Sequence, residues 1–201
     1  MNKLIKIVLF VTSTFALAGA TLAQPSVSVG VAGNAAVLAA TGVEKFTNGD
    51  TTKEYGAMEA SHGAVFVEFS PNEQVTIGVE YVPTSIESDE NINVQHDGDT
   101  RGNEQQPGGD AGNGSPKTNR VRVDIEDLTT VYAQVNHESG GYVKIGYVQA
   151  DLITKETLGT GGSYPDTDID GMMLGLGVNK SLPDGMFVRF EISAAEMDSV
   201  K

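Results

Sequence analysis

The chain has 201 residues, a formal net charge of −14 and no cysteine. The absence of cysteine excludes a disulfide framework, a thiolate metal site and a cysteine nucleophile. The acidic balance argues against a nucleic-acid partner, because such a partner requires a basic surface.

Residues 1–23 predict a secretory signal peptide. Lys3 and Lys6 give a positive start, an apolar run extends to Ala20, and Thr21-Leu22-Ala23 offers a small-x-small cleavage site. A transmembrane anchor is the alternative, which the short, interrupted run disfavours. The remaining domain, 24–201, carries 11 basic and 27 acidic residues and therefore a formal charge of −16. It contains no run of ~20 apolar residues, so it can cross a membrane only as strands.

The first half of this domain predicts three strands by its alternation of apolar and other residues. The first begins at Ser26 and alternates weakly as far as Val43, with a helix over 35–40 as the alternative. The second runs over about 59–70. The third, over 75–81, is the clearest, and Pro83 ends it.

The second half predicts four more strands. They lie over about 120–136, where an acidic Glu126-Asp127 pair interrupts the apolar phase, and over about 142–147, 171–179 and 186–193. The connections after the second, fourth and sixth strands are short. Those after the first, third and fifth are long, over about 44–58, 84–119 and 154–168. The acidic, glycine-rich segment 84–119 predicts a flexible loop.

Alternating short turns and long polar loops are typical of outer-membrane β-barrels, which have short periplasmic turns and longer outside loops. The segments Gly141-Tyr142-Val143-Lys144-Ile145-Gly146-Tyr147-Val148 and Gly175-Leu176-Gly177-Val178-Asn179 resemble strands of the small eight-stranded OmpA/OmpX-like barrels and related porin-like proteins of Gram-negative bacteria. The resemblance implies an all-β, antiparallel, up-and-down transmembrane β-barrel of about eight strands, without a catalytic apparatus.

The seven predicted strands depart from the even number of that family, and Ala194–Lys201 lacks the terminal aromatic residue that such barrels present to the assembly machinery. We expect that the closing strand is missing from the sequence. In the alternative, the long first segment splits into two elements and closes the sheet.

Each strand has two different faces. Apolar residues at every second position predict a lipid-facing surface, made of Val75, Ile77, Val79, Val143, Ile145, Leu174, Leu176, Val188 and Phe190. The opposite faces carry five charged residues, Glu68, Glu80, Lys144, Arg189 and Glu191. Because a buried charge needs a partner, we expect these five to form a structural ion-pair network in the lumen. Phe69, Tyr81, Tyr132, Tyr142 and Tyr147 lie near strand ends and are candidates for interfacial aromatic girdles.

No other motif predicts a chemical activity. Asp166, Asp168, Asp170 and Gly171 open like a calcium loop, but Gly177 stands where the motif requires glutamate. His62, His96 and His137 lack the spacing of zinc ligands. We therefore expect no catalytic, cofactor-binding or metal site and no enzymatic activity.

The sequence predicts an exported protein of the outer membrane with a structural or surface role, or a narrow pore. Its expected partners are outer-membrane lipid and the barrel-assembly machinery, and the expected state is a monomer. The alternative is a secreted or periplasmic β-sandwich binding module, because alternation alone does not separate a sandwich from a barrel.

Overall fold

The computed structural model describes residues 2–20, 25–45, 51–96, 116–158 and 165–198. In these ranges the chain is almost entirely β-strand, and no helix is long and apolar enough to cross a membrane. The elements are β1 (Asn2–Ala20), β2 (Ser26–Lys45), β3 (Thr51–Ser70), β4 (Val75–Tyr81), β5 (Ile86–Glu87), β6 (Asn91–His96), β7 (Pro116–Asn136), β8 (Gly141–Leu158), β9 (Thr167–Ser181), a 3-10 turn η1 (Pro183–Gly185) and β10 (Met186–Met197).

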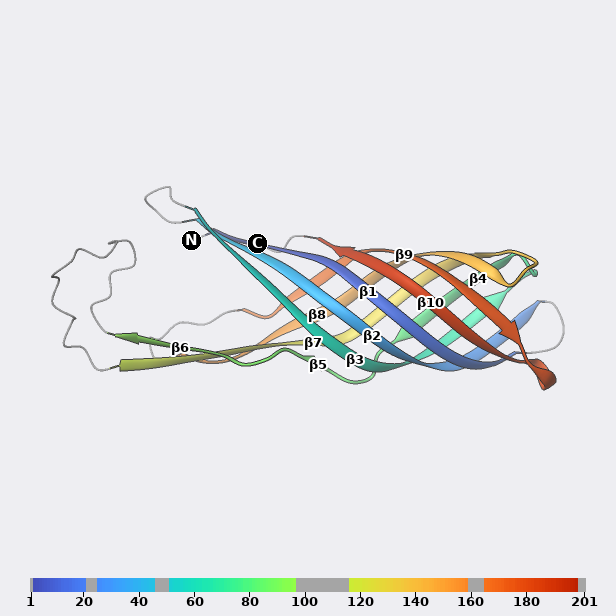
Figure 1. Cartoon of the computed structure of the whole chain (residues 1–201), viewed down its shortest axis with the longest axis horizontal. Helices are drawn as coiled ribbons and strands as arrows, with labels where there is room; N and C mark the ends of the chain where they lie inside the picture. Colours follow the sequence, from blue (N-terminus) through green and yellow to red (C-terminus); the bar gives the residue numbers. More distant parts are fainter. Residues whose placement is uncertain (1, 21–24, 46–50, 97–115, 159–164, 199–201) are drawn as a thin grey trace.

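Eight strands form a closed ring in chain order. β1 pairs with β2, β2 with β3, β3 with β4, β4 with β7, and β7 through β8 and β9 with β10, which returns to β1. Every pairing is antiparallel, so the topology is up-and-down, as expected for the fold class. The short strands β5 and β6 lie off this ring and both pair with β7. The strands cross the long axis of a cylinder obliquely, with the short turns at one end (Figure 1).

The segment Ser26–Lys45 is one continuous strand. β2 pairs with β3 without a shift in register, from Ser26 opposite Ser70 to Lys45 opposite Thr51. A helix over 35–40 and a split of this segment into two elements are therefore both wrong. Ala32 and Ala36 face inward and are 7% and 5% exposed. Small side chains suit a narrow interior, and this role explains why the strand shows so weak an apolar pattern.

The eighth position in the ring belongs to Asn2–Ala20. This strand, β1, pairs with β10 on one side and with β2 on the other, and its Ala16 and Ala18 face inward with 1% and 4% exposure. It is also the segment that the sequence predicts as a signal peptide, and that prediction stays untested. Cleavage after residue 23 would leave one edge of β2 and one edge of β10 without this neighbour.

The strands are longer than the sequence predicts. β3 begins at Thr51 instead of about 59, β7 begins at Pro116 instead of 120, and β8 continues to Leu158. The segment 84–119 contains β5 and β6 where a loop was expected, although 97–115 lies outside the described residues. An alternating apolar pattern appears only where the two faces of a strand have different surroundings. Backbone hydrogen bonds to a neighbouring strand do not need this pattern, so the strands continue through polar sequence as well.

A β-bulge interrupts β7 at the acidic pair. Between Glu126 and Thr129 β7 advances three residues while β8 advances two, and Asp127 has a φ of 52°. One extra residue turns the following side chains to the other face. Ile125 is accordingly buried (6% exposed) and Val131 is exposed (49%). Uninterrupted alternation would place both residues on the same face, and the extra residue reverses it.

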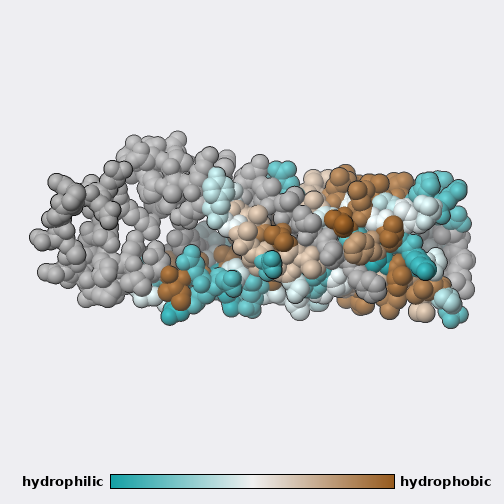
Figure 2. Space-filling model, in the orientation of Figure 1, coloured by the Kyte–Doolittle hydropathy of each residue, from teal (hydrophilic) through white to brown (hydrophobic). Residues whose placement is uncertain are grey.

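Large apolar side chains cover the outside of the barrel along part of its length. Each of the eight ring strands carries at least one exposed large apolar residue, from Leu17 on β1 to Ile192 on β10. We call this outward surface the apolar belt. In Figure 2 apolar side chains gather toward the short-turn end, with hydrophilic residues at that rim and again farther along the barrel.

Candidate functional site: the barrel interior

The five charged residues predicted for the lumen come from four strands. Glu68 lies on β3, Glu80 on β4, Lys144 on β8, and Arg189 and Glu191 on β10. Four of these residues are 3–4% exposed, and Glu80 is partly buried. The pleat of each strand directs them to the side opposite the apolar belt. The closed ring therefore brings together Glu68 and Arg189, which lie 121 positions apart in the chain.

Glu68 and Arg189 form a bidentate ion pair. Arg189 Nη1 donates to Glu68 Oε1 at 2.6 Å, and Nη2 donates to Oε2 at 3.0 Å. The hydroxyl of Tyr132 donates to the same Oε1 at 2.8 Å, and Arg189 Nε donates to Asn179 Oδ1 at 2.9 Å. Charge-assisted, bidentate bonds are the strongest type of protein hydrogen bond. Two charges can be buried together only if they are paired in good geometry and their remaining hydrogen-bonding groups have partners, and this pair has both.

Lys144 and Glu191 form a second ion pair of similar design. Lys144 Nζ lies 2.5 Å from Glu191 Oε2, and the hydroxyl of Tyr142 donates to that oxygen at 2.5 Å. Lys144 Nζ also lies 4.3 Å from the centre of the Tyr132 ring. Each buried carboxylate thus receives one cation and one tyrosine hydroxyl. We call these six residues the lumen cluster: Glu68, Tyr132, Tyr142, Lys144, Arg189 and Glu191.

Aromatic rings fill the space around these charges. The guanidinium carbon of Arg189 lies 5.5 Å from the centre of the Phe66 ring and 5.2 Å from that of Tyr142. Tyr132 and Tyr142 are 3% and 5% exposed, so their prediction as girdle residues is wrong. Their positions put them on the lumen side of the strands, where their hydroxyls find carboxylate acceptors.

Two glycines make room for these rings. A β-carbon on Gly78 would collide with the Tyr132 ring, and one on Gly177 would collide with the Tyr142 ring. The close approach of ring and backbone explains glycine at these two positions. Both rings pack against the backbone of the facing strand and are almost inaccessible to solvent.

A neutral polar layer continues the packing toward the short turns. Gln134, which is 1% exposed, donates to Asn136 Oδ1 at 2.5 Å. Asn136 Nδ2 donates to Thr76 Oγ1 at 3.1 Å, and this hydroxyl lies 2.8 Å from Ser70 Oγ. Side chains thus join β3, β4 and β7 across this layer as well.

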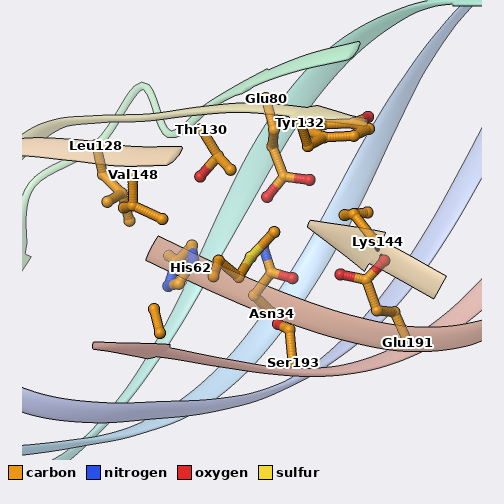
Figure 3. Close-up of a pocket in the computed structure, with 12 residues that line it drawn as sticks. Asn34, His62, Glu80, Leu128, Thr130, Tyr132, Lys144, Val148, Glu191 and Ser193 are labelled. Atoms are coloured by element: carbon orange, nitrogen blue, oxygen red, sulfur yellow. Dashed lines mark ion pairs between the residues drawn. The ribbon is translucent and has the colours of Figure 1, made fainter. Parts of the chain in front are cut away.

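A cavity of about 50 Å³ adjoins the lumen cluster on the side of the long loops. Figure 3 shows the Glu80 carboxylate directed into this space, with His62 and Asn34 also bordering it. The lining comes from β2, β3, β4, β7, β8, β9 and β10, and it consists of Asn34, His62, Glu80, Leu128, Thr130, Tyr132, Lys144, Val148, Met173, Glu191, Ser193 and Ala195.

Seven of the nine residues predicted to face lipid are exposed by 45–58%; they are Ile77, Val79, Val143, Ile145, Leu174, Leu176 and Phe190. Val75 and Val188 are partly buried. Three of the proposed girdle residues are also exposed, namely Phe69, Tyr81 and Tyr147. The hydroxyl of Tyr81 donates to Asp127 and that of Tyr147 to Asp170, both at 2.7 Å.

The histidines and acidic residues do not assemble a reactive centre. His62 lines the cavity, His137 lies beside Ser139 in the β7–β8 turn, and the side chain of His96 is outside the described residues. Among the side chains that the structure describes, no group of three histidine, aspartate or glutamate residues is close enough to hold a metal ion. The geometry of the lumen cluster is that of a packed, mutually neutralising network.

Sequence reasoning missed the two tyrosines of the lumen cluster, together with Phe66 and Gln134. Their positions along the strands were the available signal, because side chains two residues apart on a strand lie on the same face. Tyr142 shares a face with Lys144, and Tyr132 shares a face with Gln134. The partners of each tyrosine depend on the ring closure, which the positions along one strand do not reveal.

Comparison with known proteins assigns no family to the chain. No family model matches, and no curated protein matches. One solved structure, that of the Salmonella SPI-1 type III secretion injectisome secretin InvG (residues 176-end) in the open gate state, aligns with 8% identity and a TM-score of 0.15. The alignment covers 99% of this chain and 61% of that one, and at this TM-score it carries no argument about fold or function.

Proposed function

We propose that the protein is an outer-membrane β-barrel with a structural or surface role and a lumen that is closed to solutes. The apolar belt carries this proposal. A closed ring of strands that carries a belt of large exposed apolar side chains outside, at the level where its ion pairs lie inside, has the polarity of a barrel in hydrocarbon. A monomeric protein in water rarely exposes an apolar patch larger than about 300–600 Å².

The extent of the apolar belt agrees with the thickness of a membrane. On β2 the exposed apolar residues extend from Val27 to Val37. A tilted strand of about 9–11 residues spans the hydrocarbon core. In this proposal the short turns face the periplasm, and the strands continue beyond the membrane into their longer polar parts on the outside.

The exposure of individual residues favours the barrel over a β-sandwich. In a sandwich the inner faces of two sheets pack together, so one apolar face of each strand is buried. Here Ile145, Leu174 and Phe190 are 53%, 57% and 50% exposed. The inward face is instead polar and charged around the lumen cluster.

The packing of the lumen cluster favours a passive barrel over a pore. Arg189, Glu68 and the two tyrosines are almost inaccessible to a water-sized sphere, and an ion would have to separate bidentate bonds to pass between them. In this proposal the barrel is a monomer, and its partners are outer-membrane lipid and the barrel-assembly machinery.

Cell fractionation tests the location, and bilayer recordings test the closed lumen. The protein should remain with the outer-membrane fraction until detergent is added, and its gel mobility should change on heating. In planar bilayers it should produce no steady ion conductance. Solubility without detergent would reject the membrane location, whereas steady conductance would reject only the closed lumen.

A further inference from the structure

The cavity beside the lumen cluster contains an uneven number of charges. Three side chains that can carry a charge line it, Glu80, Glu191 and Lys144. Lys144 and Glu191 form an ion pair, while no ion pair of Glu80 occurs among the described residues. The other buried pair, Arg189 with Glu68, is neutral as a unit. When Glu80 is ionised, its carboxylate charge has no ion-pair partner at the cavity.

An unpaired carboxylate inside a protein requires compensation. Removing an ionised carboxylate from water is costly unless a cation or several hydrogen-bond donors replace the water. Lys144 Nζ and the Tyr142 hydroxyl both bind Glu191 Oε2, so the ion pair of Lys144 is with Glu191 and not with Glu80. A cation inside the cavity would supply this compensation.

A second group in the cavity also lacks a protein partner. The Nδ1 atom of His62 is buried and makes no hydrogen bond within the described part of the chain. His62 lines the same cavity as Glu80, from the neighbouring strand β3 (Figure 3). Buried nitrogen atoms of this type are normally satisfied by protein or water. Two groups from different strands therefore point to the same additional occupant.

We propose that the cavity is a binding site for one partly hydrated monovalent cation, held by the Glu80 carboxylate. The neutral oxygen-bearing side chains of Asn34, Thr130 and Ser193 line the same space, and hard cations prefer oxygen ligands. A cavity of about 50 Å³ is large enough for such an ion with a few waters, since a single water needs about 10–15 Å³. One of these waters reaches His62 Nδ1.

The charge of the site selects a monovalent ion. A single unpaired carboxylate balances one positive charge, whereas calcium sites usually combine several carboxylates among six to eight oxygen ligands. The ammonium group of Lys144 also repels a divalent cation more strongly than a monovalent one. The inference concerns the interior of the barrel only, so it does not depend on the location of the protein in a membrane.

Thallium(I), a monovalent ion with strong anomalous scattering, provides the test. Crystals of the full chain, grown in detergent, are soaked in thallium(I) acetate. The expected result is an anomalous peak in contact with a Glu80 carboxylate oxygen. In Glu80→Gln the concentration for half-occupancy should rise at least about ten-fold, because the ligand loses its charge. Glu138→Gln, in an exposed turn, is the matched control and should retain the peak.

Three results would overturn the proposal: a wild-type cavity without a thallium peak, a peak of unchanged occupancy in Glu80→Gln, or an infrared carboxylic-acid band at neutral pH that disappears in Glu80→Gln. The last result would show that a proton neutralises Glu80 instead of a metal cation. Folding of both variants is checked by heat-dependent gel mobility before any crystal is measured.

Discussion

The bidentate pair between Arg189 and Glu68 offers a quantitative test of the lumen cluster. Replacement of Arg189 by methionine preserves much of the side-chain volume against Phe66 and Tyr142. It leaves the Glu68 carboxylate, which is 3% exposed, with the Tyr132 hydroxyl but without a cation. Breaking a buried ion pair on one side typically costs about 3–5 kcal/mol. We expect Arg189→Met to lower the free energy of unfolding by about this amount.

A second substitution should recover most of that loss. In Arg189→Met combined with Glu68→Gln, the amide oxygen still accepts the hydrogen bond of Tyr132, and no buried charge is left. Replacing both members of a buried pair is often nearly neutral. The double variant should therefore be more stable than Arg189→Met alone, by a margin that measures the coupling of the two residues.

The assay is urea unfolding of the refolded chain in lipid vesicles, followed by circular dichroism and by heat-dependent gel mobility. Arg120→Met is the matched control, because Arg120 and Glu90 form an ion pair at 2.7 Å with side chains 49% and 45% exposed. Such a surface pair contributes about 0–1 kcal/mol. A loss of less than about 1 kcal/mol in Arg189→Met, equal to that of the control, would refute the buried network.

Three further substitutions test other parts of the structure. Gly78→Ala should destabilise the barrel by about 1–3 kcal/mol, since the new methyl group meets the Tyr132 ring, whereas Gly33→Ala, with open space at its β-carbon, should be neutral in the same unfolding assay. Leu174→Arg should cost about 2–4 kcal/mol in vesicles if Leu174 lies near the bilayer midplane; a change within about 0.5 kcal/mol is the result for an ordinary water-exposed position. Ala18→Leu should destabilise a refolded chain that retains residues 1–23 by about 1–3 kcal/mol, because Ala18 faces Gly30 inside the barrel, and unchanged unfolding would contradict the place of β1 in the ring.

Much of the fold was predictable because the two faces of a barrel strand have different surroundings. The alternation of Ile145 with Lys144 and of Phe190 with Arg189 assigns an outward and an inward side without any knowledge of the partners. The residues Pro183-Asp184-Gly185 also predict a tight turn, and in the structure Asp184 and Gly185 have positive φ there. The regular part of the barrel follows from these local patterns.

The remaining features depend on distant parts of the chain. The acidic pair at Glu126-Asp127 signalled an interruption, but only the register against β8 shows that one extra residue reverses the alternation. Asn2–Ala20 has the apolar composition of a signal peptide, and its place between β2 and β10 is a property of ring closure. The cavity likewise brings Glu80 and His62, on the paired strands β4 and β3, together with side chains of β7, β8 and β10, which the sequence of one strand alone does not indicate.

Single-cysteine spin labelling gives the most direct measurement of the central claim that the apolar belt faces hydrocarbon. The chain has no cysteine, so one label each at Ile145, Leu174 and Phe190 reports on that position alone in reconstituted vesicles. We predict that oxygen, which concentrates in lipid, collides with these labels more often than a water-soluble nickel complex does. A label at Glu138, in a short turn, should show the reverse. Preferential collision with the nickel complex at the three belt positions would contradict the account.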